Sequence, residues 1–340
     1  MGTFGSFFDR YLPSIEREMR QVLQAFDSGQ GDLFGFLRYH LGWVDAAFRP
    51  CHARSGKRIR PVLCLLACEG CGGNWEKALP AAAAIELLHN FSLIHDDIED
   101  QDEMRRGRRT VWSIWGQAQG INAGDALFSI SQLAILRLRQ RDVPPAVVLD
   151  AAQLFNETCV ALTTGQHLDI DFESRDRISV DQYVVMIEGK TAALVAATCE
   201  LGGLIAGTHA ATRSCLHAFG YHAGLAFQMQ DDVLGIWGDP TVTGKPVGSD
   251  IARGKKTLPV LHGLEQSAEL RSLLDRGSLS QTNVRQATEL LEQVGSRDYV
   301  DELARQHYQL ALRALAEASL QEPAAQALRQ LAHRLLIRQR

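Results

Sequence analysis

The sequence is poor in features that would place it in or across a membrane, or on nucleic acid. The longest apolar stretch, Thr191–Gly207, is interrupted by Glu200 and falls short of the about 20 residues that a membrane-spanning helix needs. Residues 1–12 lack the basic region and the apolar run of a secretory signal. The net charge of −5 gives no general attraction to nucleic acid or to anionic lipid. We therefore expect a cytoplasmic protein with no transmembrane segment and no nucleic acid partner.

The chain also lacks the cysteine pattern of a secreted or zinc-binding protein. Its seven cysteines are an odd number without a disulfide-like framework, which fits a reducing compartment. Cys64, Cys68 and Cys71 lie close together, but no fourth Cys or His follows at zinc spacing. We interpret these three residues as buried core thiols rather than metal ligands.

Proline is scarce as well, and no segment separates one domain from another. Only 10 prolines occur among 340 residues, and Ala, Leu, Gln and Arg are frequent, which favours helix over strand. There is no low-complexity linker, short repeat or break in composition. We predict one all-α domain over 1–340, with N-terminal helices in 1–50, the motifs of the site in 51–260 and C-terminal helices in 261–340.

Apolar periodicity predicts where several of the helices lie. We expect amphipathic helices over Pro13–Phe26 and Asp32–Phe48, and a longer one over Tyr183–Cys199. A further helix, Phe219–Asp239, contains the second of two acidic segments. The arginine-rich segment Arg105–Thr110 is expected to be a loop.

The first acidic segment is the end of a predicted helix. Apolar residues keep helical spacing from Glu86 up to the cluster His95–Asp100. Asp96 and Asp100 lie one turn apart and about 40° from each other around the helix. Their carboxylates repel unless a cation lies between them, and Mg²⁺ prefers carboxylate oxygens and also accepts phosphate. Taken alone, this segment could equally be a solvated acidic helix end.

Acidic and basic segments alternate along the chain. Arg105–Thr110 follows the first acidic helix, and Asp231 with Asp232 forms a second acidic pair far downstream. Lys245 and the segment Lys255–Pro259 come after that pair, and the basic segment Ser55–Pro61 opens a helix before the first motif. This order suits a Mg²⁺–diphosphate pocket, because carboxylates hold metals while Arg and Lys hold phosphate oxygens.

These ordered motifs resemble those of the trans-isoprenyl diphosphate synthases, which include the geranylgeranyl and farnesyl diphosphate synthases. The resemblance extends from about Ser55 to Pro259. It implies an all-α, isoprenoid-synthase-type helical bundle around a central cavity, and a homodimer. It also implies head-to-tail condensation of isopentenyl diphosphate with an allylic diphosphate, assisted by three Mg²⁺ ions in each active site.

The resemblance gives roles to the residues that match the family's motifs. Mg²⁺ would be held by Asp96, Asp100 and Asp231. Isopentenyl diphosphate would be held by Gly56, Lys57, Arg60, His89 and Arg106. The remaining residues would act on the allylic diphosphate and its carbocation. Gln166 would bind substrate, and the catalytic ones would be Asp97, Arg105, Lys190, Thr191, Gln228, Asp232, Lys245 and Lys255. Without the resemblance, His89 would be read as a core histidine and Gln166 as a polar residue on a helix surface.

Two positions bear on activity and on product length. Gly235 stands where the family's second motif usually ends in Asp, and Asp239, two turns on from Asp231, could replace that acid or not. Phe91 and Ser92 precede the first motif in a pattern that resembles geranylgeranyl synthases, which predicts a C20 product. Phe91 lies about 140° from the first metal ligand around the helix, so it could close a product tunnel in part or simply belong to the core.

Other functions fit the sequence less well. A farnesyl or longer product would need the same chemistry. A terpene cyclase would bind one diphosphate and carry a different second motif. A non-catalytic regulatory subunit of a heteromeric synthase would explain Gly235 as decay, although such a subunit should have lost several ligands. A nucleic acid module built on Arg105–Arg109 is opposed by the flanking acids.

Overall fold

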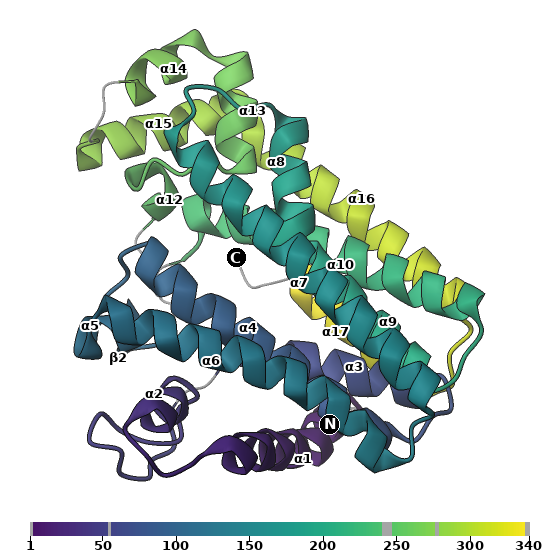
Figure 1. Ribbon diagram of the computed structural model, residues 1–340. Coiled ribbons are helices and arrows are strands. Elements are labelled where there is room, and N and C mark those ends of the chain that lie inside the picture. Colours follow the sequence, from purple (N-terminus) through teal and green to yellow (C-terminus); the bar gives the residue numbers. More distant parts are fainter. Residues whose placement is uncertain (1–2, 54–55, 240–246, 276–278, 337–340) are drawn as a thin grey trace. The chain divides into compact units, whose positions relative to one another are not determined.

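The computed structural model describes residues 3–53, 56–239, 247–275 and 279–336, and almost all of them are helical or in short connections (Figure 1). They form two compact units. One unit takes the described residues of Met1–Asn156 together with Glu200–Thr208 and Gln321–Ala327. The other takes the described residues of Glu157–Cys199, His209–Leu320 and Leu328–Arg340. The all-α fold class is confirmed, whereas the single domain over 1–340 stays a prediction.

The helices follow one another along the chain with short connections. The longer α-helices are α1 (Thr3–Phe26), α3 (Ile59–Gly70), α4 (Leu79–Glu99), α6 (Gln117–Leu136), α7 (Pro145–Ser174), α9 (Ala193–Ile205), α10 (Ala210–Trp237), α15 (Gln281–Gln293), α16 (Ser296–Glu317) and α17 (Ala324–Leu336). The shorter ones are α2 (Leu33–His40), α5 (Val111–Trp115), α8 (Val180–Ile187), α12 (Ser249–Ala252), α13 (Leu258–Gln266) and α14 (Ala268–Leu274). Among the described residues, two 3₁₀ segments, η1 (Trp75–Ala78) and η2 (Arg137–Arg141), and one π-helical segment, η3 (Glu188–Ala192), complete the helical elements.

In the first unit, the acidic helix α4 packs along α6 and also contacts α1 and α3 (Figure 1). The run Ala81–Ala84 of α4 is fully buried, and so are Ile85, Leu87 and Leu88. Alanine leaves room for neighbouring helices to approach closely, and the larger side chains that follow fill the core between them. The helix that ends in the first acidic motif is therefore anchored along its whole length.

A two-stranded hairpin follows α4 where the sequence predicted a loop. Strand β1 (Met104–Arg105) pairs antiparallel with β2 (Arg108–Arg109), so that Arg105 lies opposite Arg108. The two turn residues, Arg106 and Gly107, have φ values of 54° and 77°, as a type I′ hairpin turn requires. The prediction of a loop was wrong because strands of two residues show no apolar alternation.

In the second unit, α10 packs along α16 and also contacts η3 (Figure 1). Leu225, Met229 and Val233 lie on the buried face of α10, with Val300 and Ala304 of α16 in the same core cluster. Their spacing of three to four residues is that of one apolar helix face. This packing fixes the orientation of the second acidic motif, which lies in the last third of α10.

Several predicted helix ends need correction. The helix predicted over Asp32–Phe48 ends at His40, because Gly42 adopts a φ of 80° and the Trp43 N–H donates to the Arg38 carbonyl, which closes the helix. The helix predicted to reach Asp239 ends at Trp237. Within the described residues, no helix combines the length and the apolar character that crossing a bilayer requires.

Candidate active site

The first acidic motif separates into exposed and buried carboxylates. Asp96 is half-buried and Asp100 is exposed at the end of α4, one turn apart as predicted. Asp97 is only 2% exposed and receives a hydrogen bond from Arg105 Nε over 2.5 Å. Burial raises the pKa of Asp97 to about 6, although the neighbouring Arg105 opposes this shift. Asp97 therefore fixes the hairpin to α4, while Asp96 and Asp100 are the accessible acids.

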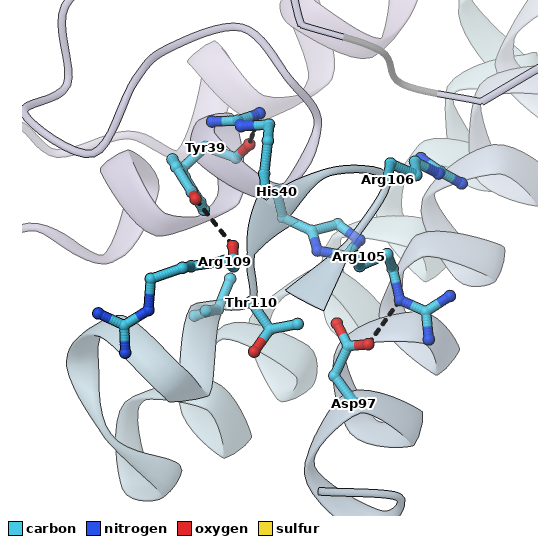
Figure 2. A pocket seen from close by; sticks show the side chains of 9 residues that line it. Tyr39, His40, Asp97, Arg105, Arg106, Arg109 and Thr110 are labelled. Atoms are coloured by element: carbon cyan, nitrogen blue, oxygen red, sulfur yellow. Dashed lines mark hydrogen bonds and ion pairs between the residues drawn. The ribbon is translucent and has the colours of Figure 1, made fainter. Parts of the chain in front are cut away.

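The hairpin β1–β2 is held from both sides (Figure 2). On one side Arg105 points at Asp97, and on the other the Tyr39 hydroxyl donates to the Arg109 carbonyl over 2.8 Å. Arg108 donates to the Tyr39 carbonyl over 3.0 Å, and its guanidinium lies 4.0 Å from the centre of the Tyr39 ring. No local pattern marks Tyr39 and Arg108 as partners at the hairpin. The pair Arg106-Gly107, as a two-residue turn, is the signal that could have indicated the hairpin.

The basic cluster predicted to hold isopentenyl diphosphate comes together in the first unit. A Cβ atom added to Gly56 would lie 2.8 Å from Arg106 Nη2, so glycine lets that guanidinium approach the backbone. Arg60, in the first turn of α3, lies 3.3 Å from His89 Nε2 of α4. Lys57 is exposed beside them. Residues from three separate parts of the sequence thus form one cationic surface.

The two histidines near this cluster are neutral. Burial and the surrounding arginines, Arg60 first among them, hold the pKa of His89 well below its usual range. Because a guanidinium can only donate, His89 Nε2 accepts from Arg60 and the ring carries its proton on Nδ1. Burial, together with the charges of Arg106, Arg105 and Arg108, lowers the pKa of His40 to about 3. His89 therefore orients Arg60 without adding a charge of its own.

In the second unit, Lys190 and Thr191 lie in the π-helical segment η3. The Ala193 N–H donates to the Glu188 carbonyl, which is the longer hydrogen bond of a π-helix. Lys190 Nζ forms an ion pair with Asp169 of α7. Lys190 and Thr191 therefore lie where a π-helical turn interrupts the α-helical hydrogen-bond pattern, and Asp169 orients the lysine. The half-buried Gln166 lies in the same helix as Asp169.

Asp232, the second acid of the second motif, is buried in a hydrogen-bond network. It is 3% exposed and accepts from the Tyr183 hydroxyl over 2.6 Å and from Gln228 Nε2 over 3.0 Å. The Thr191 hydroxyl donates to Gln228 Oε1 over 2.8 Å, which fixes the orientation of that amide. Burial raises the pKa of Asp232 to about 7, against the effect of these donors. Asp231, in contrast, is exposed.

The basic residues after the second motif also differ from one another. Lys256 donates to the carbonyls of Phe172 and Glu173 and so closes the C-terminal end of α7. Its neighbour Lys255 is half-buried and follows α12 after Arg253 and Gly254. Lys245 lies outside the described residues. Asp239 follows the end of α10 and does not continue its face, so the interpretation of this residue as lying two turns on from Asp231 was wrong.

Phe91, one of the two residues expected to set product length, faces α6. The Phe91 ring lies 5.1 Å from the Phe128 ring and 4.9 Å from the His95 ring. Ser92 donates through its hydroxyl to the His89 carbonyl over 2.9 Å. The sequence did not indicate that Phe128 contacts Phe91, since a lone Phe in an apolar helix carries no distinguishing signal.

The donor set of the two motifs fits magnesium. Asp96, Asp100 and Asp231 offer only oxygen, and each is partly or fully exposed. Among the described residues, no three His, Cys, Asp or Glu side chains are grouped so that protein alone could hold a metal. Mg²⁺ usually takes one or two carboxylates and completes its shell with water and substrate phosphate. The residues thus suit an ion that is shared with a bound diphosphate.

Comparison with known proteins decides the family. The chain matches the polyprenyl synthetase family over residues 42–291. It belongs to this family. It is 42% identical over 333 residues to a (2E,6E)-farnesyl diphosphate synthase of Mycobacterium tuberculosis. This alignment covers 96% of this chain and 90% of the relative. It is 40% identical over 300 residues to a geranylgeranyl diphosphate synthase of the same organism, covering 87% of this chain and 85% of the relative.

A solved structure of the family agrees in fold. The crystal structure of a geranylgeranyl pyrophosphate synthase from Corynebacterium glutamicum, complexed with isoprenyl diphosphate and magnesium, is 27% identical to this chain. The two superpose with a TM-score of 0.85, covering 98% of this chain and 99% of that one. Our chain is thus a prenyltransferase of the polyprenyl synthetase family, with isoprenyl diphosphates as its class of substrate.

Proposed function

We propose that this prenyltransferase condenses isopentenyl diphosphate with an allylic diphosphate in a Mg²⁺-dependent reaction and releases mainly the C20 product, geranylgeranyl diphosphate. The observation that carries the proposal is the basic cluster of the first unit, where Arg106 touches Gly56 and Arg60 is oriented by His89. Such a cluster beside an acidic helix end suits a diphosphate that shares its charge with a metal. The proposal includes the homodimer and the cytoplasmic location expected from the sequence.

In the first unit, the cationic surface would bind isopentenyl diphosphate and position its double bond. Lys57, Arg60 and Arg106 would donate to the phosphate oxygens, and His89 would keep Arg60 in place. Arg105 is fixed by Asp97, so its remaining N–H groups could serve the allylic diphosphate. Asp96 and Asp100 would hold Mg²⁺, which when bound neutralises a leaving diphosphate as a Lewis acid.

In the second unit, the polar groups around η3 would face the allylic carbocation and its diphosphate. Lys190, oriented by Asp169, would donate to the diphosphate. The Gln228 amide is held by Thr191 and Asp232, so its dipole cannot reorient when charge develops. Asp231, Lys245 and Lys255 would complete the contacts to the leaving group, and Gln166 would line the same region. The proton is expected to leave on the released diphosphate.

The proposed product length is argued from two residues of α4. The small Ser92 next to a single aromatic, Phe91, supports a C20 product. A C15 product is the second candidate, because relatives that are 42% identical to this chain are farnesyl diphosphate synthases.

The test is product analysis of the purified protein. We expect it to extend C5, C10 and C15 allylic diphosphates with isopentenyl diphosphate to a dominant C20 alcohol after dephosphorylation, and to lose this activity when EDTA removes Mg²⁺. Phe91→Ala should lengthen the product if this ring limits the chain, whereas Phe26→Ala, at an exposed site in α1, should not. A C15 end product would keep the reaction and exclude the chain-length assignment. No condensation with any of the three starters would exclude the proposed reaction.

A further inference from the structure

Gly235 occupies the position at which the second acidic motif would need its last carboxylate. It follows Asp231 by four residues on α10, as Asp100 follows Asp96 at the end of α4. Residues four apart lie on one face of a helix, one turn from each other. The face of α10 that presents Asp231 therefore has no side chain of its own at this turn.

The side chain of Asp250 fills this position from another helix. A Cβ atom added to Gly235 would lie 1.9 Å from Asp250 Oδ2 and 2.6 Å from its Cγ. These separations are far below a van der Waals contact, so the Asp250 carboxylate lies in the space that a side chain at 235 would take.

The backbone around Asp250 is fastened to α10 at Gly235 and at the next residue, Ile236. The Gly248 N–H donates to the Ile236 carbonyl over 3.0 Å, and the Ser249 hydroxyl lies 3.3 Å from the Gly235 carbonyl. Ile251, the next residue, is 2% exposed and packs against Ile236 in a core cluster. The short helix α12 therefore cannot carry its carboxylate away from α10 without breaking these contacts.

A backbone hydrogen bond also links Asp250 to Lys255. The Lys255 N–H donates to the Asp250 carbonyl over 2.9 Å, so Asp250 and Lys255 are placed by one small structure. Asp250 also contributes to the raised pKa of Tyr183, the residue that donates to Asp232. The charge of Asp250 is therefore close to the buried network of the second motif.

We propose that Asp250 supplies the third carboxylate of the second acidic motif, and that Gly235 is the residue that makes room for it. Asp231 and Asp250 then offer two carboxylates one helical turn apart toward a Mg²⁺–diphosphate, as Asp96 and Asp100 do in the first motif. This inference rests on the proposed function of the site. It explains the glycine as part of a rearranged motif rather than as a lost ligand.

The two explanations of Gly235 predict opposite effects of restoring the acid. If the glycine were a loss, Gly235→Asp would strengthen Mg²⁺-dependent binding of diphosphate. If Asp250 already fills the position, Gly235→Asp crowds two carboxylates together and weakens that binding. Gly235→Ala is the milder test, because only the tip of the Asp250 side chain needs to turn away and alanine favours the helix.

The experiment measures binding of inorganic diphosphate, with and without Mg²⁺, by isothermal titration calorimetry of the full chain. We expect Asp250→Ala, Gly235→Ala and Gly235→Asp each to weaken the Mg²⁺-dependent binding by about tenfold or more. The double variant Gly235→Asp/Asp250→Ala moves the carboxylate to α10 and should return to within about threefold of wild type. Thermal unfolding of every variant is measured alongside, and Gly235→Ala should unfold no earlier than wild type.

Asp239→Ala is the matched control, since it removes the acid that the sequence offered as a replacement. It should bind as wild type does. Unchanged binding in Asp250→Ala, or tighter binding in Gly235→Asp, would overturn the inference and leave the proposed function standing. A wild-type protein that binds no Mg²⁺–diphosphate and condenses no substrate would overturn the proposed function and this inference with it.

Discussion

At the scale of single residues, a buried acid, Glu86, offsets part of the positive charge of the basic cluster. Glu86 is 3% exposed, and burial raises its pKa while Arg58, Arg60 and Arg106 oppose that shift. The two histidines nearby are neutral, so the positive charge of the cluster comes from its arginines and from Lys57. The buried Glu86 offsets part of the arginines' mutual repulsion, and the neutral histidine rings add no charge to it. The arginines can therefore lie close together.

The neutral state of His40 makes the stability of the protein depend on pH. The unfolded histidine takes up a proton near pH 6.5, whereas folded His40 does so only at about pH 3. The unfolded state therefore binds more protons between these values, and the free energy of unfolding falls as the pH is lowered through this window. We expect wild type to lose about 1 kcal/mol more than His40→Gln between pH 6.5 and 5.5.

Chemical denaturation at several pH values measures this difference. Other groups titrate in both proteins, so the comparison isolates His40. His52→Gln changes an exposed histidine and should keep the wild-type dependence on pH. Parallel stability curves for wild type and His40→Gln would show that His40 is not held neutral by the fold.

Much of the site at this scale could be predicted from the sequence, because motif spacing identifies the residue types that metals and phosphates need. Asp96, Arg60 and Lys190 are examples. The partners that orient them, such as Tyr39 for the hairpin and Tyr183 for Asp232, come from other helices. No local pattern marks those partners, since only tertiary packing brings them near.

At the scale of elements, the decisive feature of the second unit is the close approach of α7 to η3. A Cβ atom added to Gly165 of α7 would lie 2.1 Å from the Lys190 nitrogen and 2.6 Å from the Gly189 carbonyl carbon. Both of these atoms belong to the backbone, which cannot turn aside as a side chain can. The π-helical segment and the glycine of the facing helix therefore depend on each other.

Gly165→Ala should push η3 away from α7. We expect the free energy of unfolding to fall by about 1–3 kcal/mol, as for other overpacked interiors, and the activity to fall with it because Lys190 and Thr191 move. Urea unfolding followed by circular dichroism measures the first effect. Gly5→Ala is the control, since nothing lies within 4 Å of the added atom in α1. Equal stability of Gly165→Ala and wild type would contradict this account of the packing.

The elements themselves were predictable to different degrees. The long helices α1, α4 and α10 have a clear apolar period, so their presence follows from the sequence. The π-helical segment could not be predicted, because it depends on the approach of a second helix at Gly165. The end of α2 did have a local signal in Gly42, whose positive φ stops the helix.

At the scale of the whole molecule, the seven cysteines all lie among the described residues and form no disulfide there, and they differ in how deeply they are buried. Cys64, Cys68, Cys159 and Cys199 are buried, whereas Cys51, Cys71 and Cys215 are half-buried. Burial raises the pKa of both Cys68 and Cys199 to about 12, and that of Cys71 to about 11. The interpretation of Cys64 and Cys68 as core thiols is confirmed, and Cys71 lies at the edge of the core.

Thiol titration should therefore report on the integrity of both units at once. Because the thiolate is the reactive form, we expect only Cys51 and Cys215 to react quickly with a chromogenic disulfide at pH 8. All seven thiols should react after unfolding in guanidinium. Fast reaction of more than two thiols in the folded protein would show that thiols other than Cys51 and Cys215 are accessible, and reaction of fewer than seven after unfolding would show a disulfide.

The family and the class of reaction could be predicted for the whole molecule because the order of the motifs survives in the sequence. The product length could not, because in the proposed function it depends on the shape of the space beside side chains such as Phe91 and Phe128. A resemblance in two residues cannot fix that shape.

Three charged doublets share one design: Asp96–Asp97, Asp231–Asp232 and Lys255–Lys256. In the acidic doublets the second residue is buried and hydrogen-bonded to the fold, and in the basic one Lys256 closes the end of a helix. The two identical residues of a doublet therefore do not replace one another. A genetic screen that scores only growth would rank both members of a doublet as equally essential. Abundance of the protein in the cell would separate them. In the proposed function, losing the first residue of a doublet leaves folded but inactive protein, whereas losing the second, which is bonded to the fold, lowers the amount of protein.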